Sequence, residues 1–237
     1  PQNNGVSHFI EHMLFKGTET RTAKQIAEEF DRIGGNINAF TSKENTCYYA
    51  KVLDHHAEHA VEILADMFFH SQFDANEIEK ERQVVLEEIN MVEDTPDDIV
   101  HEYLWQAMYE NDPLGAPILG TEETLNSFTK ETIQAYMKKH YTPENVVISV
   151  AGNIPEGLLE YIETLFSQLE KSSNEKIPMA TPELRAVHVE NFRETEQAHL
   201  CLAYPSLSVK ADNIYSLVVM NNILGGSMSS RLFQEIR

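Results

Sequence analysis

Apolar positions along the first half of the chain recur with a helical period, interrupted once by a pattern typical of strands. Thr22, followed by Gln25 three residues later, indicates the start of a helix. Residues 36–41 and 46–52 are rich in β-forming residues and flank a polar turn, which predicts a β-hairpin. The spacing of apolar residues predicts further helices at about 6–15, 54–70, 75–94 and 97–110.

The second half of the chain carries weaker periodic signals. We expect a helix near 130–140, a buried strand over 146–151 and a further helix opened by Pro155. Residues 171–183 contain two prolines and have no apolar period, which is typical of a linker. Beyond the linker the pattern predicts strands near 185–190 and 197–204, a helix near 211–223 and a short final helix.

Composition limits the class of protein and of partner. With 42% hydrophobic residues in 237, the chain has the composition of a globular protein rather than a disordered one. Its 38 acidic and 18 basic residues give a formal net charge of −20, which argues against nucleic acid and favours basic partners. No apolar run approaches the ~18 residues of a membrane span. Cys47 and Cys201 form no disulfide framework, which favours a reducing compartment.

The first predicted helix carries two histidines four positions apart, His8 and His12, with Glu11 between them. Residues i and i+4 share one helix face, so both imidazoles can converge on one metal ion. Glu11 then projects toward the open position of the metal, where it can take a proton from bound water. The rest of this helix is apolar nearly all round, as in a buried helix. The alternative is a pair of hydrogen-bonded core histidines.

A second segment, His55 to His59, has the same spacing and serves as an internal comparison. His55 and His59 project onto the helix face opposite to the predicted apolar side chains. That face also carries Glu62 and Asp66, so we interpret it as solvated. The apolar side chains of this helix are Val61, Leu64, Ala65 and Phe68.

A zinc site needs a third protein ligand, and the helix predicted at 75–94 offers two carboxylates. Glu81 and Glu88 lie on or beside its apolar stripe, two turns apart. A carboxylate facing the core costs several kcal/mol unless it is paired or binds metal. The alternatives are a bond to an arginine or a backbone amide, or a helix face rotated by one residue. The stripe consists of Ile78, Val85, Ile89 and Val92.

Four segments together resemble one known family. They are HFIEHMLFKGT at 8–18, NAFTSKENTCYY at 38–49, ERQVVLEEINMVED at 81–94 and LGGSMSSRLFQEIR at 224–237. In sequence, order and spacing they resemble the pitrilysin-type (M16) zinc peptidases, closest to mitochondrial processing peptidase β-subunits and their bacterial relatives. The family pattern has its third ligand 76 residues after the second histidine, which from His12 is Glu88 and from His59 is Ala135.

The resemblance implies roles for the residues of the site. His8, His12 and Glu88 would bind one zinc ion per chain, with water in the fourth position. Glu11 would be the general base. Glu81 falls on a further acidic position of the family that supports catalysis without being a primary ligand.

The resemblance also implies how substrate is held. The strand with Asn38, Ala39 and Phe40 resembles the edge strand to which these enzymes add an extended peptide. The alternative is that this strand is ordinary core sheet. Arg237 falls on an arginine of the second domain that contacts substrate in the family.

The fold that the resemblance implies is α+β, with two homologous domains facing each other across a chamber. Each domain would be a mainly antiparallel sheet packed against helices. We expect the zinc-binding catalytic domain, without its first strands, at 1–172, a linker at 173–183, and the start of a truncated second domain at 184–237.

The expected function is zinc-dependent hydrolysis of unfolded peptides, with a preference for basic ones. The main alternative is a non-catalytic structural or partner subunit of the same family, which the presence of all four motif residues disfavours. A metal-binding module without peptidase activity is a further alternative. We expect a homodimer or pairing with a related subunit, no contact with nucleic acid or membrane, and a location in bacterial cytoplasm or, alternatively, the mitochondrial matrix.

Overall fold

The structure is a computed structural model that describes residues 2–110, 112–171, 182 and 184–236. It divides into two compact units, Pro1–Leu200 and Cys201–Arg237, which are described separately below. The predicted linker at 173–183 lies almost entirely outside the described residues, as does Arg237.

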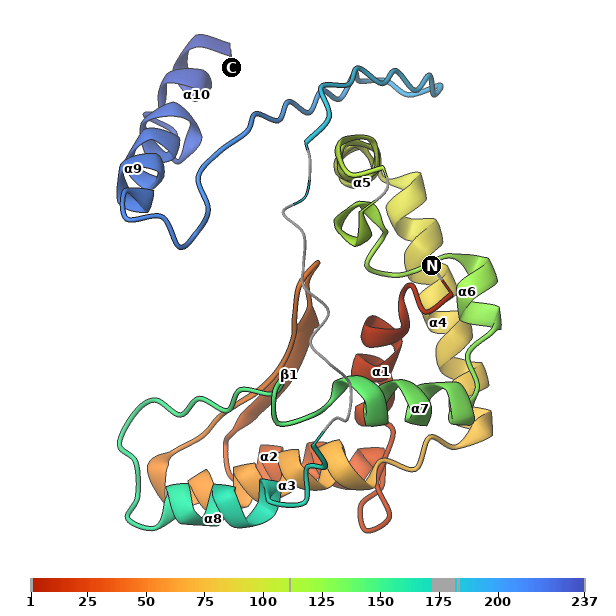
Figure 1. Cartoon of the computed structure of the whole chain (residues 1–237), viewed down its shortest axis with the longest axis vertical. Coiled ribbons are helices and arrows are strands. Elements are labelled where there is room, and N and C mark those ends of the chain that lie inside the picture. The colour runs from red at the N-terminus through yellow and green to blue at the C-terminus, as the bar shows by residue number, and fades with distance from the viewer. Residues whose placement is uncertain (1, 111, 172–181, 183, 237) are drawn as a thin grey trace. The chain divides into compact units, whose positions relative to one another are not determined.

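The first unit is mostly helical, with one two-stranded antiparallel sheet (Figure 1). Its strands are β1 (Asn36–Thr41) and β2 (Thr46–Lys51). Its α-helices are α1 (Val6–Leu14), α2 (Ala23–Arg32), α3 (Ala57–His70), α4 (Ala75–Asp94), α5 (Pro96–Met108), α6 (Glu122–Asn126), α7 (Lys130–His140) and α8 (Leu158–Phe166). Two 3-10 turns occupy Asp54–His56 and Pro113–Gly115.

The helix starts follow local capping chemistry. At α2 the Thr22 side chain accepts from the Gln25 amide, and the Gln25 side chain accepts from the Thr22 amide, which completes a capping box. At α4 the Asp74 carboxylate accepts from the first-turn amides of Asn76 and Glu77. These contacts confirm the predicted start of α2 and fix the first residue of the long helix that carries Glu81 and Glu88.

The predicted hairpin is confirmed. Its register runs from Asn36 opposite Lys51 to Thr41 opposite Thr46, and the Ser42 amide closes the turn by donating to the Asn45 carbonyl at 2.8 Å. No described segment pairs with the outer edge of β1. The hairpin therefore presents an edge strand.

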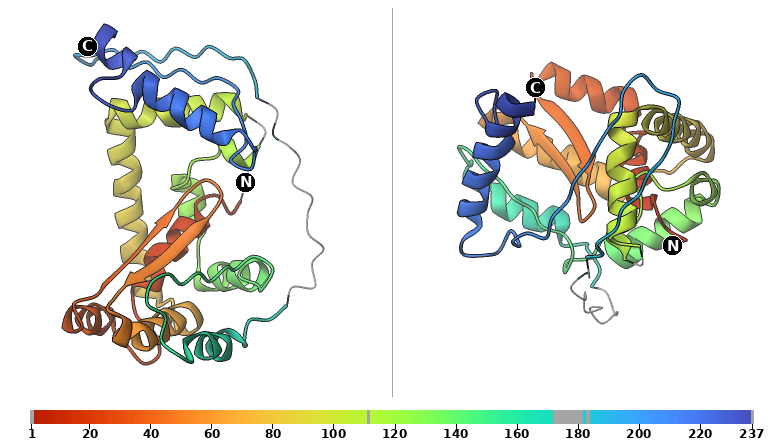
Figure 2. Two further views of the ribbon diagram at one scale, coloured as in Figure 1. Left: turned by 90° about the vertical axis from the view of Figure 1, so that its left-hand side faces the viewer. Right: turned by 90° about the horizontal axis from the view of Figure 1, so that it is seen from above.

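Helix α1 is the centre of the first unit. It contacts α4, α7 and both strands of the hairpin, and Figure 1 shows it between the hairpin and α4. Helices α2, α3 and α8 lie together at the end of the hairpin opposite its turn (Figure 2). The core around α1 is apolar; its fully buried side chains include Phe9, Ile10, Met13, Phe30, Ile63, Met67, Val85, Leu125 and Ile133. The expectation that α1 is a buried helix is confirmed.

The prediction of a buried strand at 146–151 is wrong. These residues have no regular secondary structure, and Val147 is 91% exposed instead of buried. A strand exists only where a neighbouring strand shares its hydrogen bonds, and none of the described residues pairs with this segment. Apolar, β-branched composition marks such a segment but does not supply its partner.

The strands predicted near 185–190 and 197–204 are wrong for the same reason. Neither segment has regular secondary structure or a paired strand within the described chain, and Leu200, Leu202 and Tyr204 are exposed. The expectation of mainly antiparallel sheets is therefore corrected to helices packed around one hairpin. The short helix α6 was not expected.

The buried face predicted for α3 is wrong by one residue. The buried side chains include Ala60, Ile63 and Met67, whereas Val61, Leu64 and Phe68 are half-buried; of the predicted set only Ala65 is buried. The carboxylate of Asp66, predicted on a solvated face, is also buried. It accepts hydrogen bonds from Thr18 Oγ1 at 2.7 Å, Thr20 Oγ1 at 3.0 Å and Arg21 Nη1 at 2.8 Å. These partners come from the loop between α1 and α2, so periodicity within α3 gives no sign of them.

The second unit contains α9 (Ile214–Gly225) and α10 (Arg231–Ile236), close to the predicted helices. The two helices contact each other. Apolar side chains of α9, among them Val218, Val219 and Ile223, are exposed. Within the described residues, no helix is both long enough and apolar enough to cross a membrane.

Candidate metal centre

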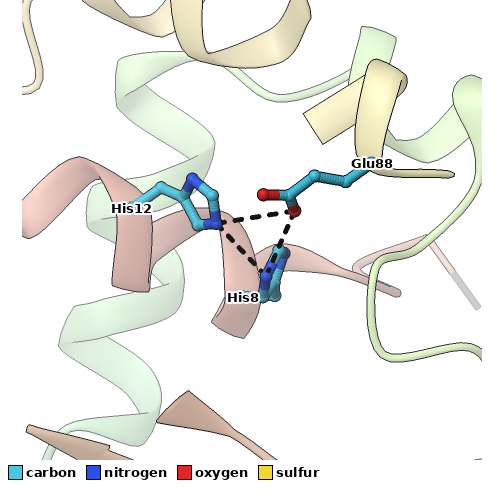
Figure 3. Close-up of side chains that lie close together, drawn as sticks. All are labelled: His8, His12 and Glu88. Carbon is cyan, nitrogen blue, oxygen red and sulfur yellow. Dashed lines mark hydrogen bonds and ion pairs between the residues drawn. The ribbon is translucent and has the colours of Figure 1, made fainter. Parts of the chain in front are cut away.

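Helices α1 and α4 bring three donor side chains together (Figure 3). The Nε2 atoms of His8 and His12 lie 3.2 Å apart, and each lies 3.7 Å from Oε2 of Glu88. The two histidines are neighbours because they are one helical turn apart on α1, and α4 crosses beside them with Glu88 facing inward. The three residues that the sequence pointed to as metal ligands thus meet at one place.

The spacing of these donors fits a zinc ion. Two ligands of a tetrahedral zinc with bonds of about 2.1 Å are about 3.4 Å apart, between the two distances observed here. The donor set of two imidazoles and one carboxylate is one that catalytic zinc uses, with a fourth position left for water. The Glu88 side chain is 35% exposed, so this side of the group is open to solvent.

His8 has the protonation state that a metal ligand needs. Burial, together with the nearby charge of His12, lowers the pKa of His8 to about 4, so its imidazole is neutral at pH 7. A neutral imidazole offers a lone pair on Nε2, whereas a protonated one cannot bind metal. Its Nδ1 atom is buried and has no hydrogen-bond partner among the described residues.

His12, in contrast, is held by a carboxylate on its far side. Its Nδ1 lies 2.8 Å from Oε1 of Glu81. Because a carboxylate accepts hydrogen bonds, Nδ1 carries the hydrogen and donates the hydrogen bond. Burial pulls the pKa of His12 down, but the Glu81 hydrogen bond and the negative charges of Glu88, Glu81 and Glu11 outweigh it and raise the pKa. The tautomer with a proton on Nδ1 leaves Nε2 facing His8 and Glu88.

Glu81 is buried, with a side chain only 5% exposed, and both of its oxygens are used. Oε1 accepts from His12, and Oε2 lies 2.5 Å from the ammonium of Lys16. Burial alone would raise the pKa of Glu81, yet the hydrogen bonds from His12 and Lys16 lower it overall. Lys16 was not expected; its position four residues after His12 places it on the same side of the chain.

Glu11 projects from α1 toward the hairpin. Its Oε2 accepts a hydrogen bond from the hydroxyl of Thr41, the last residue of β1. The Thr41 hydroxyl also lies 3.2 Å from that of Thr46 on the opposite strand. Nothing in the sequence pattern indicated this contact, because it joins segments 30 residues apart.

The residues predicted to bind substrate lie on the exposed edge strand. Asn38 and Phe40 are exposed and Ala39 is half-buried. The Ala39 amide donates to the Asn38 side chain at 2.9 Å instead of to β2, so it faces the outer edge of β1. Arg237, the fourth such residue, lies outside the described residues.

The second histidine segment forms no metal site in the part of the chain that the structure describes. His55 lies in a 3-10 turn and His59 in α3. His59 pairs with Glu29 at 3.3 Å and with Glu62 at 3.6 Å. Among described residues only His8, His12 and Glu88 group their donor atoms within 4.8 Å. The His55 side chain is 64% exposed, as the solvated interpretation predicts, whereas that of His59 is 37% exposed and lies between the carboxylates of Glu29 and Glu62.

Comparison with known proteins assigns both halves of the chain to related families. The family described as "Insulinase (Peptidase family M16)" matches residues 1–122. The family described as "Peptidase M16 inactive domain" matches residues 127–237.

Two named relatives of the chain are bacterial. The chain is 57% identical over 237 residues to the "Uncharacterized zinc protease YmxG" of Bacillus subtilis, covering 100% of this chain and 58% of the relative. It is 44% identical over 240 residues to an "Uncharacterized zinc protease" of Rickettsia felis, covering 100% of this chain and 57% of the relative. The chain thus spans less than two thirds of the length of these relatives.

Solved structures share the fold. A protease from Helicobacter pylori has a TM-score of 0.81 at 21% identity, covering 99% of this chain and 58% of that one. Pitrilysin has a TM-score of 0.66 at 23% identity, covering 78% of this chain and 20% of that one. With both halves matched and 57% identity to a named zinc protease, the chain belongs to the M16 insulinase family of zinc peptidases.

Proposed function

We propose that this chain carries the catalytic centre of a zinc-dependent endopeptidase that hydrolyses unfolded peptides. The observation that supports this most directly is the convergence of His8, His12 and Glu88, with a spacing suited to one zinc ion per chain. Glu11 lies between the two histidines in sequence, where the reaction needs a base. Family membership supports the same reaction class.

When bound, zinc would lower the pKa of its water and polarise the carbonyl of the peptide bond. His8 and His12 would hold the ion through their Nε2 lone pairs, and Glu88 would hold it through its carboxylate. Glu11 takes the proton of the attacking water and later delivers it to the leaving amine. Thr41 occupies Oε2 of Glu11, which leaves Oε1 as the oxygen that receives the proton.

We propose that the substrate binds as an added strand along the outer edge of β1. The Ala39 amide faces that edge, and a peptide could take it over by displacing the Asn38 side chain. Backbone pairing of this kind accepts many sequences, since it contacts no side chain of the substrate. Thr41, at the end of the same strand, contacts Glu11, so a peptide paired with β1 would lie close to the base.

For the complete protein we propose two homologous domains facing across a chamber, as the matches to both M16 families suggest. Such a chamber would admit unfolded peptides and exclude folded proteins. The processing of basic peptides is the substrate class that the net charge of −20 favours. The chain has only two cysteines, Cys47 and Cys201, too few for a disulfide framework, which suits bacterial cytoplasm. A homodimer or a related partner subunit is the assembly we propose.

The test is the Glu11→Gln variant, compared with the wild type for metal content by mass spectrometry and for peptide turnover. We expect near one zinc per chain in both proteins and a turnover at least ~100-fold lower in the variant, because the base is lost and the ligands are not. Glu58→Gln, at the matching position of the second histidine segment, is the control and should keep full turnover. A wild type without measurable turnover would favour the non-catalytic subunit instead, whereas equal measurable turnover in Glu11→Gln and wild type would rule out Glu11 as the base.

A further inference from the structure

Lys16 makes a contact that connects it to the candidate metal centre through one intermediate. Its ammonium lies 2.5 Å from Oε2 of Glu81, whose other oxygen lies 2.8 Å from Nδ1 of His12. His12 in turn presents Nε2 toward His8 and Glu88. A chain of contacts thus runs from Lys16 through Glu81 to His12, whose Nε2 faces the candidate metal position.

The local backbone places Lys16 for this contact. Helix α1 ends at Leu14, and the amides of Phe15 and Lys16 donate to the carbonyls of His12 and Met13, which tightens the last turn. Lys16 therefore follows His12 on the side of the chain that faces α4. Glu81 enters from α4, so its carboxylate lies between the two.

The orientation of Glu81 needs a partner on each oxygen. The terminal torsion of a glutamate is broad, so packing against the methylenes alone does not fix the plane of the carboxylate. Each of the two hydrogen bonds constrains that plane, and the one from Lys16 is charge-assisted and short. Without Lys16, Oε2 of this nearly fully buried carboxylate has no cation beside it. An unpaired buried oxygen is unfavourable, so the Glu81 side chain would rotate to find another partner and lose its hydrogen bond with His12.

We propose that Lys16 is a positioning residue of the metal centre. By fixing Glu81, it holds the His12 ring so that Nδ1–H donates to the carboxylate and the Nε2 lone pair faces the metal position. This inference rests on the proposed zinc site. It extends that site by a residue that binds neither metal nor substrate.

The experiment measures zinc affinity by competition with a chromophoric chelator, so that its readout does not depend on peptide hydrolysis. Lys16→Met should weaken zinc binding about 10- to 100-fold, as is usual when a group that orients a metal ligand is removed. Lys16→Arg restores the cation and should recover most of the affinity. Lys24→Met is the matched control, because Lys24 is 83% exposed and pairs only with Glu28 in the described structure; its affinity should stay within twofold of wild type.

A double variant distinguishes a positioning role of Lys16, exerted through Glu81, from a contact that only stabilises the packing of α1 against α4. If Lys16 acts through Glu81, then Lys16→Met combined with Glu81→Gln should bind zinc no more weakly than Glu81→Gln alone. Melting temperatures of the metal-free proteins are measured in parallel, since a merely structural role would lower these without affecting zinc affinity. Lys16→Gln replaces Lys16→Met if the latter does not fold.

The outcomes are distinct. A wild type that binds no zinc overturns the proposed function, and this inference with it. A wild type that binds zinc while Lys16→Met binds it equally well overturns the inference alone. Losses that add in the double variant also overturn it, because they show that Lys16 acts independently of Glu81.

Discussion

At the scale of single residues, Glu81 and Thr41 contact side chains of the candidate metal centre and of its proposed base. Glu81 orients His12, and Thr41 holds one oxygen of Glu11. Both contacts cross between elements, one from α4 to α1 and the other from β1 to α1. The reactive side chains are therefore set by the packing around α1 as much as by their own spacing along the helix.

The first prediction concerns the hydroxyl of Thr41. Thr41→Val keeps the β-branched shape but removes the hydrogen bond to Glu11, so kcat should fall about tenfold, a fraction of what general-base catalysis contributes. KM should change little, because the edge of β1 keeps its backbone. Steady-state kinetics on one unfolded peptide measure both constants.

Two variants control this experiment. Thr41→Ser keeps the hydroxyl and should recover most of kcat. Thr46→Val removes the hydroxyl on the opposite strand and should leave kcat within twofold. A rise in KM at constant kcat would contradict the assignment, since it would place the role of Thr41 in the substrate strand and not in the base.

The sequence indicated His8, His12 and Glu88 and also Glu81, but not Lys16 and Thr41, which contact Glu81 and Glu11. His8 and His12 follow from helical periodicity, and Glu88 follows from its position on an apolar stripe together with the family spacing. Lys16 and Thr41 could not be found in this way. Their roles depend on partners that only the tertiary structure brings near, and neither lysine nor threonine is unusual at such positions.

At the scale of elements, polar side chains that reach across the core hold the helices in place. Arg82 on α4 is buried and donates to the backbone carbonyls of Leu125 and Phe128, the latter at 2.9 Å. Asp66 on α3 accepts three hydrogen bonds from the loop that follows α1. Each of these ties fixes a neighbour of the helices that carry the site.

Arg82→Leu should lower the free energy of unfolding by about 3 kcal/mol, because it leaves two buried carbonyls without their donor. Lys80→Leu, two residues earlier on the exposed face of α4, should change it by no more than about 0.5 kcal/mol. Urea denaturation of the three proteins gives these values. Equal stability of Arg82→Leu and wild type would mean that other donors replace the guanidinium.

Asp66 predicts a pH dependence of stability. Burial favours the neutral carboxyl, but the hydrogen bonds from Thr18, Arg21 and Thr20 lower its pKa in the folded protein. A carboxyl whose folded pKa is depressed stabilises the fold fully above its unfolded pKa of about 3.9, and loses this contribution as pH falls through the folded value. The stability difference between wild type and Asp66→Asn should therefore be constant near neutral pH and shrink below about pH 4.

Urea denaturation over a series of pH values measures this difference, which we expect to be about 3 kcal/mol at pH 7. Glu28→Gln is the control, because Glu28 forms an exposed pair with Lys24 and should contribute less than about 1 kcal/mol at any pH. A difference between wild type and Asp66→Asn that persists unchanged at pH 3 would show that the contacts of Asp66 do not depend on its charge.

Elements, like residues, could be predicted where they depend on local sequence and could not where they depend on a distant segment. Helices α1, α2, α3, α4 and α7 follow from periodicity and capping within each segment, and the hairpin follows from two adjacent β-rich runs with a short turn. The segments at 146–151, 185–190 and 197–204 have similar composition but no adjacent partner. Strand formation is decided by pairing with a distant segment, which a local pattern does not contain.

At the scale of the whole molecule, the excess of acidic residues is the observation behind the proposed preference for basic peptides. Under that proposal, the negative potential of a chain with net charge −20 would raise the local concentration of basic peptides and lower that of acidic ones. The site itself adds Glu11, Glu81 and Glu88 to this field, offset within the described contacts by Lys16. Both effects act before any side chain of the substrate is recognised.

The corresponding prediction separates long-range charge from specific recognition. Peptides of equal length and backbone but opposite net charge should differ in kcat/KM by about tenfold in favour of the basic one at 10 mM salt, where the Debye length is about 30 Å. At 1 M salt that length falls to about 3 Å, so the ratio should approach one if the field of the whole chain is responsible. A preference that survives high salt would instead place selectivity in a pocket at the site. Equal rates for both peptides at low salt would remove the proposed preference, while leaving the metal centre and the role of Glu11 to stand on their own tests.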